Sequence, residues 1–374
     1  MVKFRKTIVD TENHYESAAM IDVDGDGILD IVCGEYWYKG PDFTKKFKMY
    51  QADKLYYPLL DESIYYDSGA VPMDVNGNGR KDLICVSWFR HTLFWLENPG
   101  GEGEWKKHVI DDQCPNGETL FAHDIDNDGY DEIIPATVRY PLHIYKLDRD
   151  ENGKPLGTFT KHVIEGEPDT IDLGHGIGFA DINGDGKDEV LTPNGWYLVP
   201  PEDIYGSKWL SFREYRMGMY VSMPMVGYDV NGDGYMDIVY GGGHGYGLFW
   251  LEQQRLDFEN SRWVQHVVDD AASQYHWLEL ADIDNDGKME IITGKRYKAH
   301  GDKDPGSFDP LILSYYKPDD KGRLIRYIID HGDERACCGI GMNPQAGDFY
   351  GNGRVDILAP GNDGLAIFEN LGNC

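Results

Sequence analysis

The sequence predicts an all-β fold, a seven-bladed β-propeller whose blades carry Asp-rich calcium loops. Three observations support this prediction. One motif rich in Asp, Asn and Gly occurs seven times, its copies lie 48 to 66 residues apart, and no long segment has the period of an amphipathic helix. That spacing is the size of one four-stranded blade.

Each copy of the motif has an aspartate, a hydrophobic residue, a turn-forming run and a closing acid followed by β-branched residues. The copies are IDVDGDGILDIV, MDVNGNGRKDLI, HDIDNDGYDEII, ADINGDGKDEVL, YDVNGDGYMDIV, ADIDNDGKMEII and GDFYGNGRVDIL, with first aspartates at positions 22, 74, 124, 181, 229, 282 and 348. Strand-like segments such as LFWLEN and WKKHVID follow, which gives four short strands per repeat. Residues 3–9 resemble the last of these strands, so we expect them to complete the seventh blade and close one propeller over residues 1–374.

The charge balance argues against nucleic acid or membrane partners. Lysine and arginine number 35 against 65 acids, a net charge of −30, which opposes attraction to phosphates and anionic lipid. No run of about 18 apolar residues and no signal peptide is present, so we expect a cytoplasmic protein or one already trimmed for secretion or the periplasm. The six cysteines have no metal-site spacing and are predicted to be free thiols.

Five of the seven loops have the composition of a calcium site. In the first, Asp22, Asp24, Asp26 and Asp30 place carboxylates at positions 1, 3, 5 and 9, and hard oxygen ligands in a tight loop select calcium. The alternative is a metal-free hairpin held by side-chain to backbone hydrogen bonds. The other predicted ligands are Asp124, Asp126, Asp128 and Glu132; Asp181, Asn183, Asp185 and Glu189; Asp229, Asn231, Asp233 and Asp237; and Asp282, Asp284, Asp286 and Glu290. Loops two and seven, with Asn76, Asn78, Tyr350 and Asn352, are predicted to be metal-free.

The repeated motif resembles the FG-GAP or VCBS repeat, and the resemblance spans nearly the whole chain. It implies a propeller with metal loops. It implies no single function, because adhesion proteins, binding proteins and polysaccharide lyases all use this repeat, so function has to be argued from the other face of the ring.

Residues six to eight positions before each first aspartate, and thirteen to eighteen after it, are expected on that other face, around a central funnel. This set is rich in His, Arg, Lys and aromatic residues: histidine can move protons near neutral pH, aromatic faces suit sugar rings, and cations suit anions. The predicted catalytic residues are His175, His276, Tyr297 and Tyr246. The predicted substrate-binding residues are His14, Glu35, Trp37, Arg90, His91, Arg139, Tyr140, Trp196, His244, Lys295, Arg296 and His300.

Two alternatives remain open for this set. The tryptophans and histidines could be structural, with Trp37 and Trp196 in the core between blades. The histidines His14, His175, His244 and His276 could instead gather around an additional divalent metal such as zinc, which imidazole suits.

The segments HGIGFADINGDGKDEVLTPNGW and HWLELADIDNDGKMEIITGKRYKAHGDKDPG resemble propeller enzymes related to aldos-2-ulose dehydratase and, more loosely, lyases of uronate-containing glycans. The resemblance implies β-elimination from an anionic or carbonyl-bearing saccharide. A base, an acid and a cation that holds the enolate would be needed. The competing hypotheses are a calcium-dependent propeller that only binds carbohydrate or protein, and a glycoside hydrolase on the same scaffold.

Overall fold

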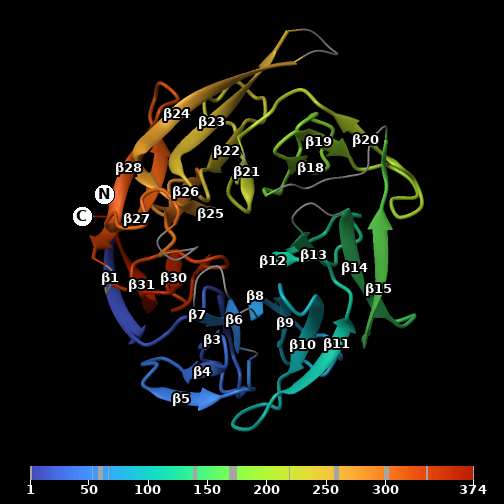
Figure 1. Cartoon of the computed structure of the whole chain (residues 1–374), viewed down its shortest axis with the longest axis vertical. Coiled ribbons are helices and arrows are strands. Elements are labelled where there is room, and N and C mark those ends of the chain that lie inside the picture. The colour runs from blue at the N-terminus through green and yellow to red at the C-terminus, as the bar shows by residue number, and fades with distance from the viewer. Residues whose placement is uncertain are drawn as a thin grey trace.

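The computed structural model describes residues 2–52, 54–57, 62–65, 67–137, 141–167, 175–218, 220–256, 261–298, 303–333 and 336–373, with side chains left out for residues 54–57, 62–65 and 67. This part of the chain contains strands, turns and irregular segments but no helix, and the sheets are arranged radially around one axis (Figure 1). The predicted all-β propeller with Asp-rich loops is confirmed. Among the described residues, no helix has the length and apolar character needed to cross a lipid bilayer.

Each blade is an antiparallel meander that starts at the axis, and we number the blades by their Asp motifs. Blades one to three contain β2 (Ala18–Ile21), β3 (Asp30–Cys33), β4 (Tyr36–Lys39) and β5 (Lys45–Lys48); β8 (Asp67–Met73), β9 (Asp82–Ser87), β10 (Thr92–Glu97) and β11 (Lys106–Asp111); and β12 (Gly117–His123), β13 (Glu132–Thr137), β14 (Leu142–Arg149) and β15 (Pro155–Ile164). A hairpin of β6 (Lys54–Tyr57) and β7 (Glu62–Tyr65) lies between blades one and two in the chain.

Blades four to six follow the same order along the chain. They contain β17 (Gly178–Ala180), β18 (Glu189–Thr192), β19 (Gly195–Leu198) and β20 (Trp209–Phe212); β21 (Met225–Gly227), β22 (Ile238–Gly241), β23 (Tyr246–Arg255) and β24 (Ser261–Ser273); and β25 (Tyr275–Ala281), β26 (Glu290–Lys295), β27 (Leu311–Pro318) and β28 (Leu324–Gly332). Blades four and five are joined through parallel pairing of β17 with β21, and β16 (Gly166–Glu167) pairs with β20.

Blade seven is built from both ends of the described chain. Its strands are β29 (Gln345–Gly347), β30 (Asp356–Gly361) and β31 (Gly364–Asn373), and β1 (Val2–Asp10) pairs antiparallel with β31 as the outermost strand (Figure 1). This pairing joins the first strand to the last blade, so β31 is covered by a neighbour on each side.

The apolar core lies within and between the blades. The second strand of each blade is buried along its length, as in β3, β9 and β13, whereas outer strands such as β11 and β15 consist mostly of exposed and half-buried positions. Trp37, Trp105 and Trp209 are among the largest fully buried side chains. The five described cysteines are free and buried, which excludes disulfides from the described core.

The Asp motif forms the turn from the first to the second strand of each blade. In loop one, Asp22 accepts hydrogen bonds from the backbone of Gly25 and Gly27, whose φ angles of 77° and 85° suit glycine. The closing acid Asp30 accepts the backbone N–H of Val23 at 2.9 Å. The same bond from the residue after the first aspartate recurs in all seven loops, so the motif fixes a turn as well as offering ligands.

Candidate metal centre

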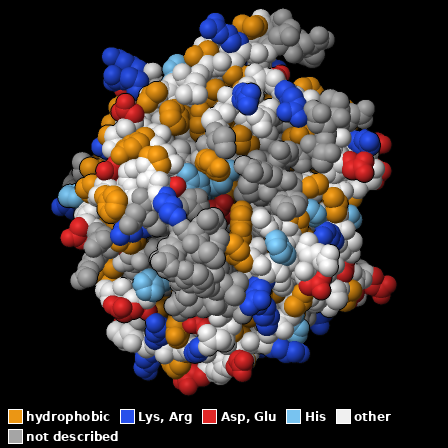
Figure 2. Space-filling view, viewed as in Figure 1, with side chains coloured by type: hydrophobic (Ala, Val, Ile, Leu, Met, Phe, Trp, Pro, Cys, Tyr) orange, Lys and Arg blue, Asp and Glu red, His pale blue; other side chains and the backbone are white. Residues whose placement is uncertain are grey.

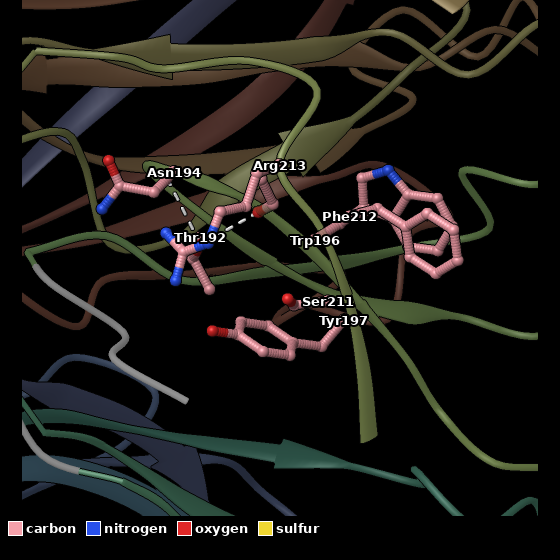
Figure 3. Close-up of a pocket in the computed structure, with 8 residues that line it drawn as sticks. Thr192, Asn194, Trp196, Tyr197, Ser211, Phe212 and Arg213 are labelled. Atoms are coloured by element: carbon pink, nitrogen blue, oxygen red, sulfur yellow. Dashed lines mark hydrogen bonds between the residues drawn. The ribbon is translucent and has the colours of Figure 1, made fainter. Parts of the chain in front are cut away.

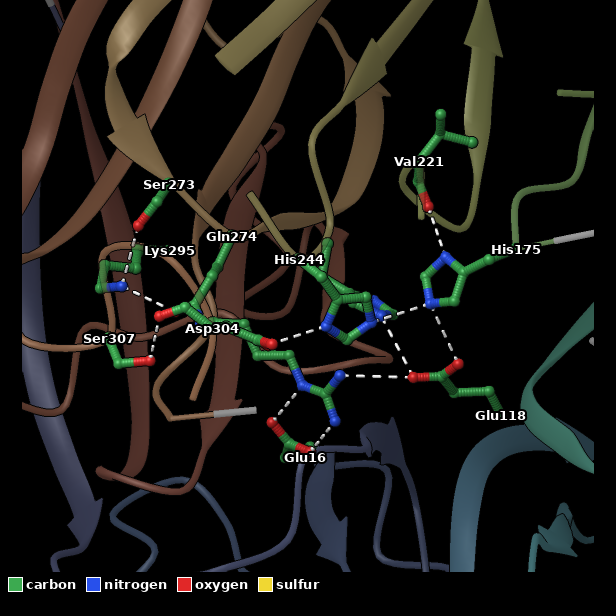
Figure 4. Close-up of polar contacts among 12 residues, drawn as sticks. Glu16, Glu118, His175, Val221, His244, Ser273, Gln274, Lys295, Asp304 and Ser307 are labelled. Carbon is green, nitrogen blue, oxygen red and sulfur yellow. Dashed lines mark hydrogen bonds and ion pairs between the residues drawn. The ribbon is translucent and has the colours of Figure 1, made fainter. Parts of the chain in front are cut away.

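The opposite end of the innermost strands brings together polar residues from five blades. Glu16, Glu118, His175 and His276 each lie six residues before the first aspartate of their motif. Because the innermost strands run in the same direction around the axis, these positions meet at one end of it (Figures 1 and 4). His244, from the turn between β22 and β23, joins them.

Glu118, His175, His244 and His276, which we call the funnel cluster, have the arrangement of a metal centre. One ligand atom from each lies within 4.8 Å of those of the others. Nε2 of His175 is 2.9 Å from Nε2 of His244 and 3.2 Å from Glu118 Oε2, and Nε2 of His276 is 3.2 Å from Glu118 Oε1. Two ligands bound at right angles to one ion at about 2.1 Å would lie about 3 Å apart, close to these spacings.

The hydrogen bonds behind the histidines fix which ring nitrogens face one another. Nδ1 of His175 donates to the carbonyl oxygen of Val221 at 2.7 Å, and Nδ1 of His244 donates to Asp304 Oδ2 at 2.8 Å (Figure 4). Each Nε2 therefore carries a lone pair in the neutral ring. Either a proton on one ring or a metal ion bound by both rings would relieve the repulsion between two such lone pairs 2.9 Å apart. Carboxylate or carbonyl partners behind ligating histidines are usual in metal sites.

The protonation states of the cluster also suit a metal. Burial lowers the pKa of His276 to about 3, with the Arg296 guanidinium adding to the effect, and burial lowers the pKa of His244. Burial raises the pKa of Glu118, but His175 and His276 outweigh it and hold that pKa well below its usual range. Neutral imidazoles and an ionised carboxylate are the forms that bind divalent ions. Nδ1 of His276 has no hydrogen-bond partner among the described residues.

Arg296, predicted to bind an anionic ligand, is engaged by acids of the protein. Its Nε and Nη2 donate to the two carboxylate oxygens of Glu16 at 2.8 and 2.7 Å, and Nη1 lies 3.3 Å from Glu118 Oε1. These ion pairs link blades one, three and six, and Arg296 contacts the same oxygen of Glu118 as His276 does.

Lys295 holds the loop that supports His244. The side chain is fully buried, and its ammonium donates to Gln274 Oε1 and Gly306 O at 2.6 Å and to Ser273 Oγ at 3.1 Å. Burial lowers the pKa of Lys295 to about 8. Because Gly306 lies in the same loop as Asp304, this anchor fixes the carboxylate that orients His244.

One exposed aromatic side chain contacts the funnel cluster, and two others lie on the segments that carry His244 and Asp304. The ring of Tyr220, 41% exposed, makes edge contacts with the rings of His175 and His244, and Tyr220 has a φ of 62°. Tyr246 is 45% exposed and donates to Asp309 at 2.6 Å, and Phe308, on the loop of Asp304, is 77% exposed. Figure 2 shows histidine atoms near the centre of this face. The sequence analysis did not assign Tyr220, Phe308 or Asp304 to this site. It also left Glu16 and Glu118 out of the predicted catalytic and substrate-binding residues, although they occupy the same position of the repeat as His175 and His276.

Other predicted binding residues lie apart from these contacts. Trp37 is buried against Phe47, Trp196 stacks on Phe212, and Glu35 accepts the backbone N–H of Ala52. His14, Arg90 and His91 are exposed, and Tyr297 packs on the core of blades six and seven. Arg139, Tyr140 and His300 lie outside the described residues.

A small pocket lies beside β18, β19 and β20 (Figure 3). It is lined by Thr192, Asn194, Trp196, Tyr197, Ser211, Phe212 and Arg213. Thr192 Oγ1 donates to Gly195 O at 2.9 Å and accepts from the backbone of Asn194, whereas Ser211 Oγ is buried without a hydrogen-bond partner among the described residues. Trp196 therefore lines this pocket in blade four, and none of the described interactions links it to the funnel cluster.

In three of the five predicted calcium loops, three of the acids lie close together. In loops one, three and six, carboxylate oxygens of positions 1, 3 and 9 lie within 4.8 Å of one another, a spacing that can hold a cation. In loop four, Asn183 donates to Asp185 and Glu189, and burial raises the pKa of Glu189 to about 8. In loop five, Asn231 donates to Asp233, and Asp237 accepts the backbone N–H of Val230.

One family model matches the chain. It is the FG-GAP-like repeat, over residues 74–135, 124–192 and 229–293, which contain the Asp motifs of blades two to six. Among solved structures it is similar to the exotype rhamnogalacturonan lyase YesX, with a TM-score of 0.49 and 13% identity over 98% of this chain and 73% of that one. It is also similar to the Tc holotoxin pore of Photorhabdus luminescens, with a TM-score of 0.38 and 13% identity over 89% of this chain and 15% of that one. No curated protein matches the sequence.

Proposed function

We propose that the funnel cluster binds a divalent metal ion and forms the active centre of a carbohydrate lyase or dehydratase that performs β-elimination. The observation that carries this proposal is the pair of Nε2 atoms of His175 and His244, 2.9 Å apart with both Nδ1 atoms committed to acceptors. Glu118 and His276 complete the ligand set. Imidazole and carboxylate together suit zinc, manganese and iron more than calcium.

When bound, such an ion would act as a Lewis acid that lowers the free energy of the negative charge developing beside the carbon that loses its proton. In this proposal Glu118, His175, His244 and His276 are ligands, which replaces the expected base role of His175 and His276. Asp304 and the Val221 carbonyl hold two of the rings in the ligating tautomer.

Proton transfer is assigned to tyrosines at the mouth of the centre. Tyr220 lies against His175 and His244 and is exposed, so a bound substrate can reach it, and in its phenolate form it would accept the proton that leaves the carbon. The hydrogen bond that Tyr246 donates to Asp309 raises the pKa of Tyr246, which keeps it protonated and suits donation to a leaving oxygen.

The pairing of the cationic side chains near the funnel indicates the class of substrate. Because Arg296 and Lys295 are directed at protein acceptors, a substrate carboxylate or carbonyl would be met by the metal ion and not by these cations. The exposed faces of Tyr220, Tyr246 and Phe308 suit sugar rings. With the resemblance of the two funnel segments to sugar-eliminating propellers, these features support a uronate-containing glycan or a keto-sugar as substrate.

We further propose structural calcium in Asp loops four and five. Each offers two aspartates, an asparagine oxygen and a buried closing acid, Glu189 or Asp237, at positions 1, 3, 5 and 9. Loops one, three and six differ from these two because a lysine of the same blade contacts their carboxylates.

The test is continuous near-ultraviolet absorbance of metal-loaded protein with a panel of uronate glycans and keto-sugars, because elimination creates an absorbing double bond. Glu118→Gln is the test variant and His162→Gln, on the outer strand of blade three, is the matched control. We expect a rise in absorbance with the wild type and the control and none with Glu118→Gln. New reducing ends without absorbance would indicate a hydrolase, and calorimetric binding without product would indicate a binding module; either outcome overturns the proposal.

A further inference from the structure

Three lysine ammonium groups lie inside the Asp loops on the face opposite the funnel. Lys317 Nζ is 2.5 Å from Asp284 Oδ2, 2.6 Å from Asp286 Oδ2 and 3.1 Å from Glu290 Oε1. Lys146 makes the same three contacts in loop three, with Asp126, with Asp128 at 2.7 Å and with Glu132 at 3.1 Å. Lys39 contacts Asp24, and Asp26 at 2.7 Å, in loop one.

The strand register shows that these lysines occupy one equivalent position. Each lies on the third strand of its blade, directly across from the closing acid of the loop, as the pairs Ile31 with Tyr38, Ile133 with Tyr145 and Ile291 with Tyr316 require. In blades one to seven this position holds Lys39, Glu97, Lys146, Leu198, Glu252, Lys317 and Glu369.

The type of residue at this position correlates with the type of residue at position 3 of the loop. Position 3 in the same order is Asp24, Asn76, Asp126, Asn183, Asn231, Asp284 and Tyr350. Lysine accompanies aspartate in all three cases, and glutamate or leucine accompanies an uncharged residue in all four. In blades two and five the glutamate instead receives the asparagine amide, Asn76 on Glu97 and Asn231 on Glu252, each at 3.4 Å.

We propose that loops one, three and six are closed by a lysine of the chain itself, in place of a bound calcium ion, and that the residue across from the closing acid sorts the seven loops into lysine-closed and lysine-free classes. An ammonium has three donors, which match the carboxylates of positions 3, 5 and 9 in loops three and six and those of positions 3 and 5 in loop one. A divalent ion at the same point would lie against a positive charge, and the lysine stem, fixed in a strand, keeps that charge in place.

The electrostatics of the lysines are consistent with a fixed charge. Burial lowers the pKa of Lys146 and of Lys317, but the hydrogen bonds to the loop carboxylates outweigh it and keep each pKa well above its usual value. For Lys39 the bonds to Asp24 and Asp26 raise the pKa. The inference concerns the Asp loops alone and stands independently of the function proposed for the funnel.

The first experiment counts bound calcium by calorimetry and measures the melting temperature with and without calcium. Lys146→Met removes the charge and keeps the stem, and Lys161→Met, on the adjacent strand of the same blade, is the control. We expect the wild type and the control to bind the same number of ions. Lys146→Met should bind one more, and its lowered melting temperature should recover when calcium is added. An unchanged count for a folded Lys146→Met overturns the proposal.

Two further variants keep the test decisive if Lys146→Met does not fold. Asp126→Asn leaves the calcium count of the wild type unchanged if loop three holds lysine, and lowers it by one if loop three holds calcium, which would overturn the proposal. Lys146→Glu with Asp126→Asn recreates the pair found in blade two. This double variant should melt several degrees higher than Lys146→Glu alone, and the absence of any recovery would contradict the pairing rule.

Discussion

The funnel cluster and the lysine-closed Asp loops lie at opposite ends of the same innermost strands, and both concentrate groups that need a cation. At the Asp loops a lysine from the third strand supplies it, as Lys317 does for Asp284 and Asp286. At the funnel the nearby arginine is engaged by Glu16, and the Nε2 atoms of His175 and His244 face each other beside Glu118. The two proposals therefore differ in the source of the cation, which is a side chain of the protein at the Asp loops and an ion from solution at the funnel.

The acids of the Asp loops and of the funnel cluster also differ in where their partners come from. A lysine-closed loop satisfies its carboxylates within one blade, so it stabilises that blade and offers little to a ligand. The funnel cluster takes its residues from four blades, and its arrangement depends on the closed ring. Breaking each kind of site should therefore change different measurements.

Removing a funnel ligand should have the largest effect. Glu118→Gln removes the negative charge that faces His175 and His276, so we expect metal content to fall to a small fraction and turnover to drop by about 100-fold or more. Metal analysis of dialysed protein and the absorbance assay measure this. The melting temperature of His162→Gln and its metal content should match the wild type, whereas a fully active Glu118→Gln would remove the funnel from consideration.

Disturbing the residue behind a ligand should have a smaller effect of the same kind. Asp304→Asn weakens the acceptor that holds Nδ1 of His244, so metal affinity should fall by about 10- to 100-fold with the ligands intact. Competition with a chelator gives the affinity, and saturating metal should restore most of the activity. Asp309→Asn, in the same loop, is the control. Equal affinity of Asp304→Asn and wild type would show that Asp304 does not position His244.

Much of this architecture is predictable from the repeat. Seven copies with blade-sized spacing predict the propeller, and the fixed offset from the first aspartate predicts one end of the axis for His175 and His276, because every innermost strand runs the same way. The offset after the aspartate likewise selects His244 and Arg296. The repeat alone is sufficient to place these residues, because the chain follows the same path in every blade.

The partners of these residues are not predictable in the same way. Arg296 was expected to be available to a ligand, but Glu16 comes from a blade 280 residues earlier in the chain, and only ring closure brings the two together. Asp304 lies in an insertion whose path no repeat determines. The closing lysines require strand register, because Lys39, Lys146 and Lys317 follow their closing acids at different sequence distances.

At a lysine-closed loop, stability should change and metal content at the funnel should not. Lys317→Met leaves Asp284, Asp286 and the fully buried Glu290 without their cation, so the free energy of unfolding should fall by about 2–3 kcal/mol in calcium-free buffer. Lys321→Met, at an exposed turn, should change it by less than about 0.5 kcal/mol. Urea unfolding measures both. If Lys317→Met lost turnover but kept its stability, the funnel cluster would depend on this Asp loop, which would contradict the prediction.

Glu279 is an intermediate case, since it lies on β25 between His276 and the Asp loop of blade six. It accepts the backbone N–H of Ala346 at 3.2 Å, and among the described residues no lysine or arginine pairs with it. Burial raises the pKa of Glu279 to about 7 from an ordinary 4.5. The folded state therefore keeps its proton where the unfolded chain has lost it, so its contribution to stability is complete below about pH 4.5 and declines until about pH 7.

The Glu279→Gln variant should remove this pH dependence, which is the smallest effect expected here. Because Glu279 is only partly buried and water reduces the penalty, the wild type should lose about 1–2 kcal/mol relative to the variant between pH 5 and pH 8. Parallel urea unfolding curves at each pH provide the measurement. Identical pH dependence of the two proteins would show that the proton of Glu279 contributes nothing to stability in this range, which would contradict its raised pKa.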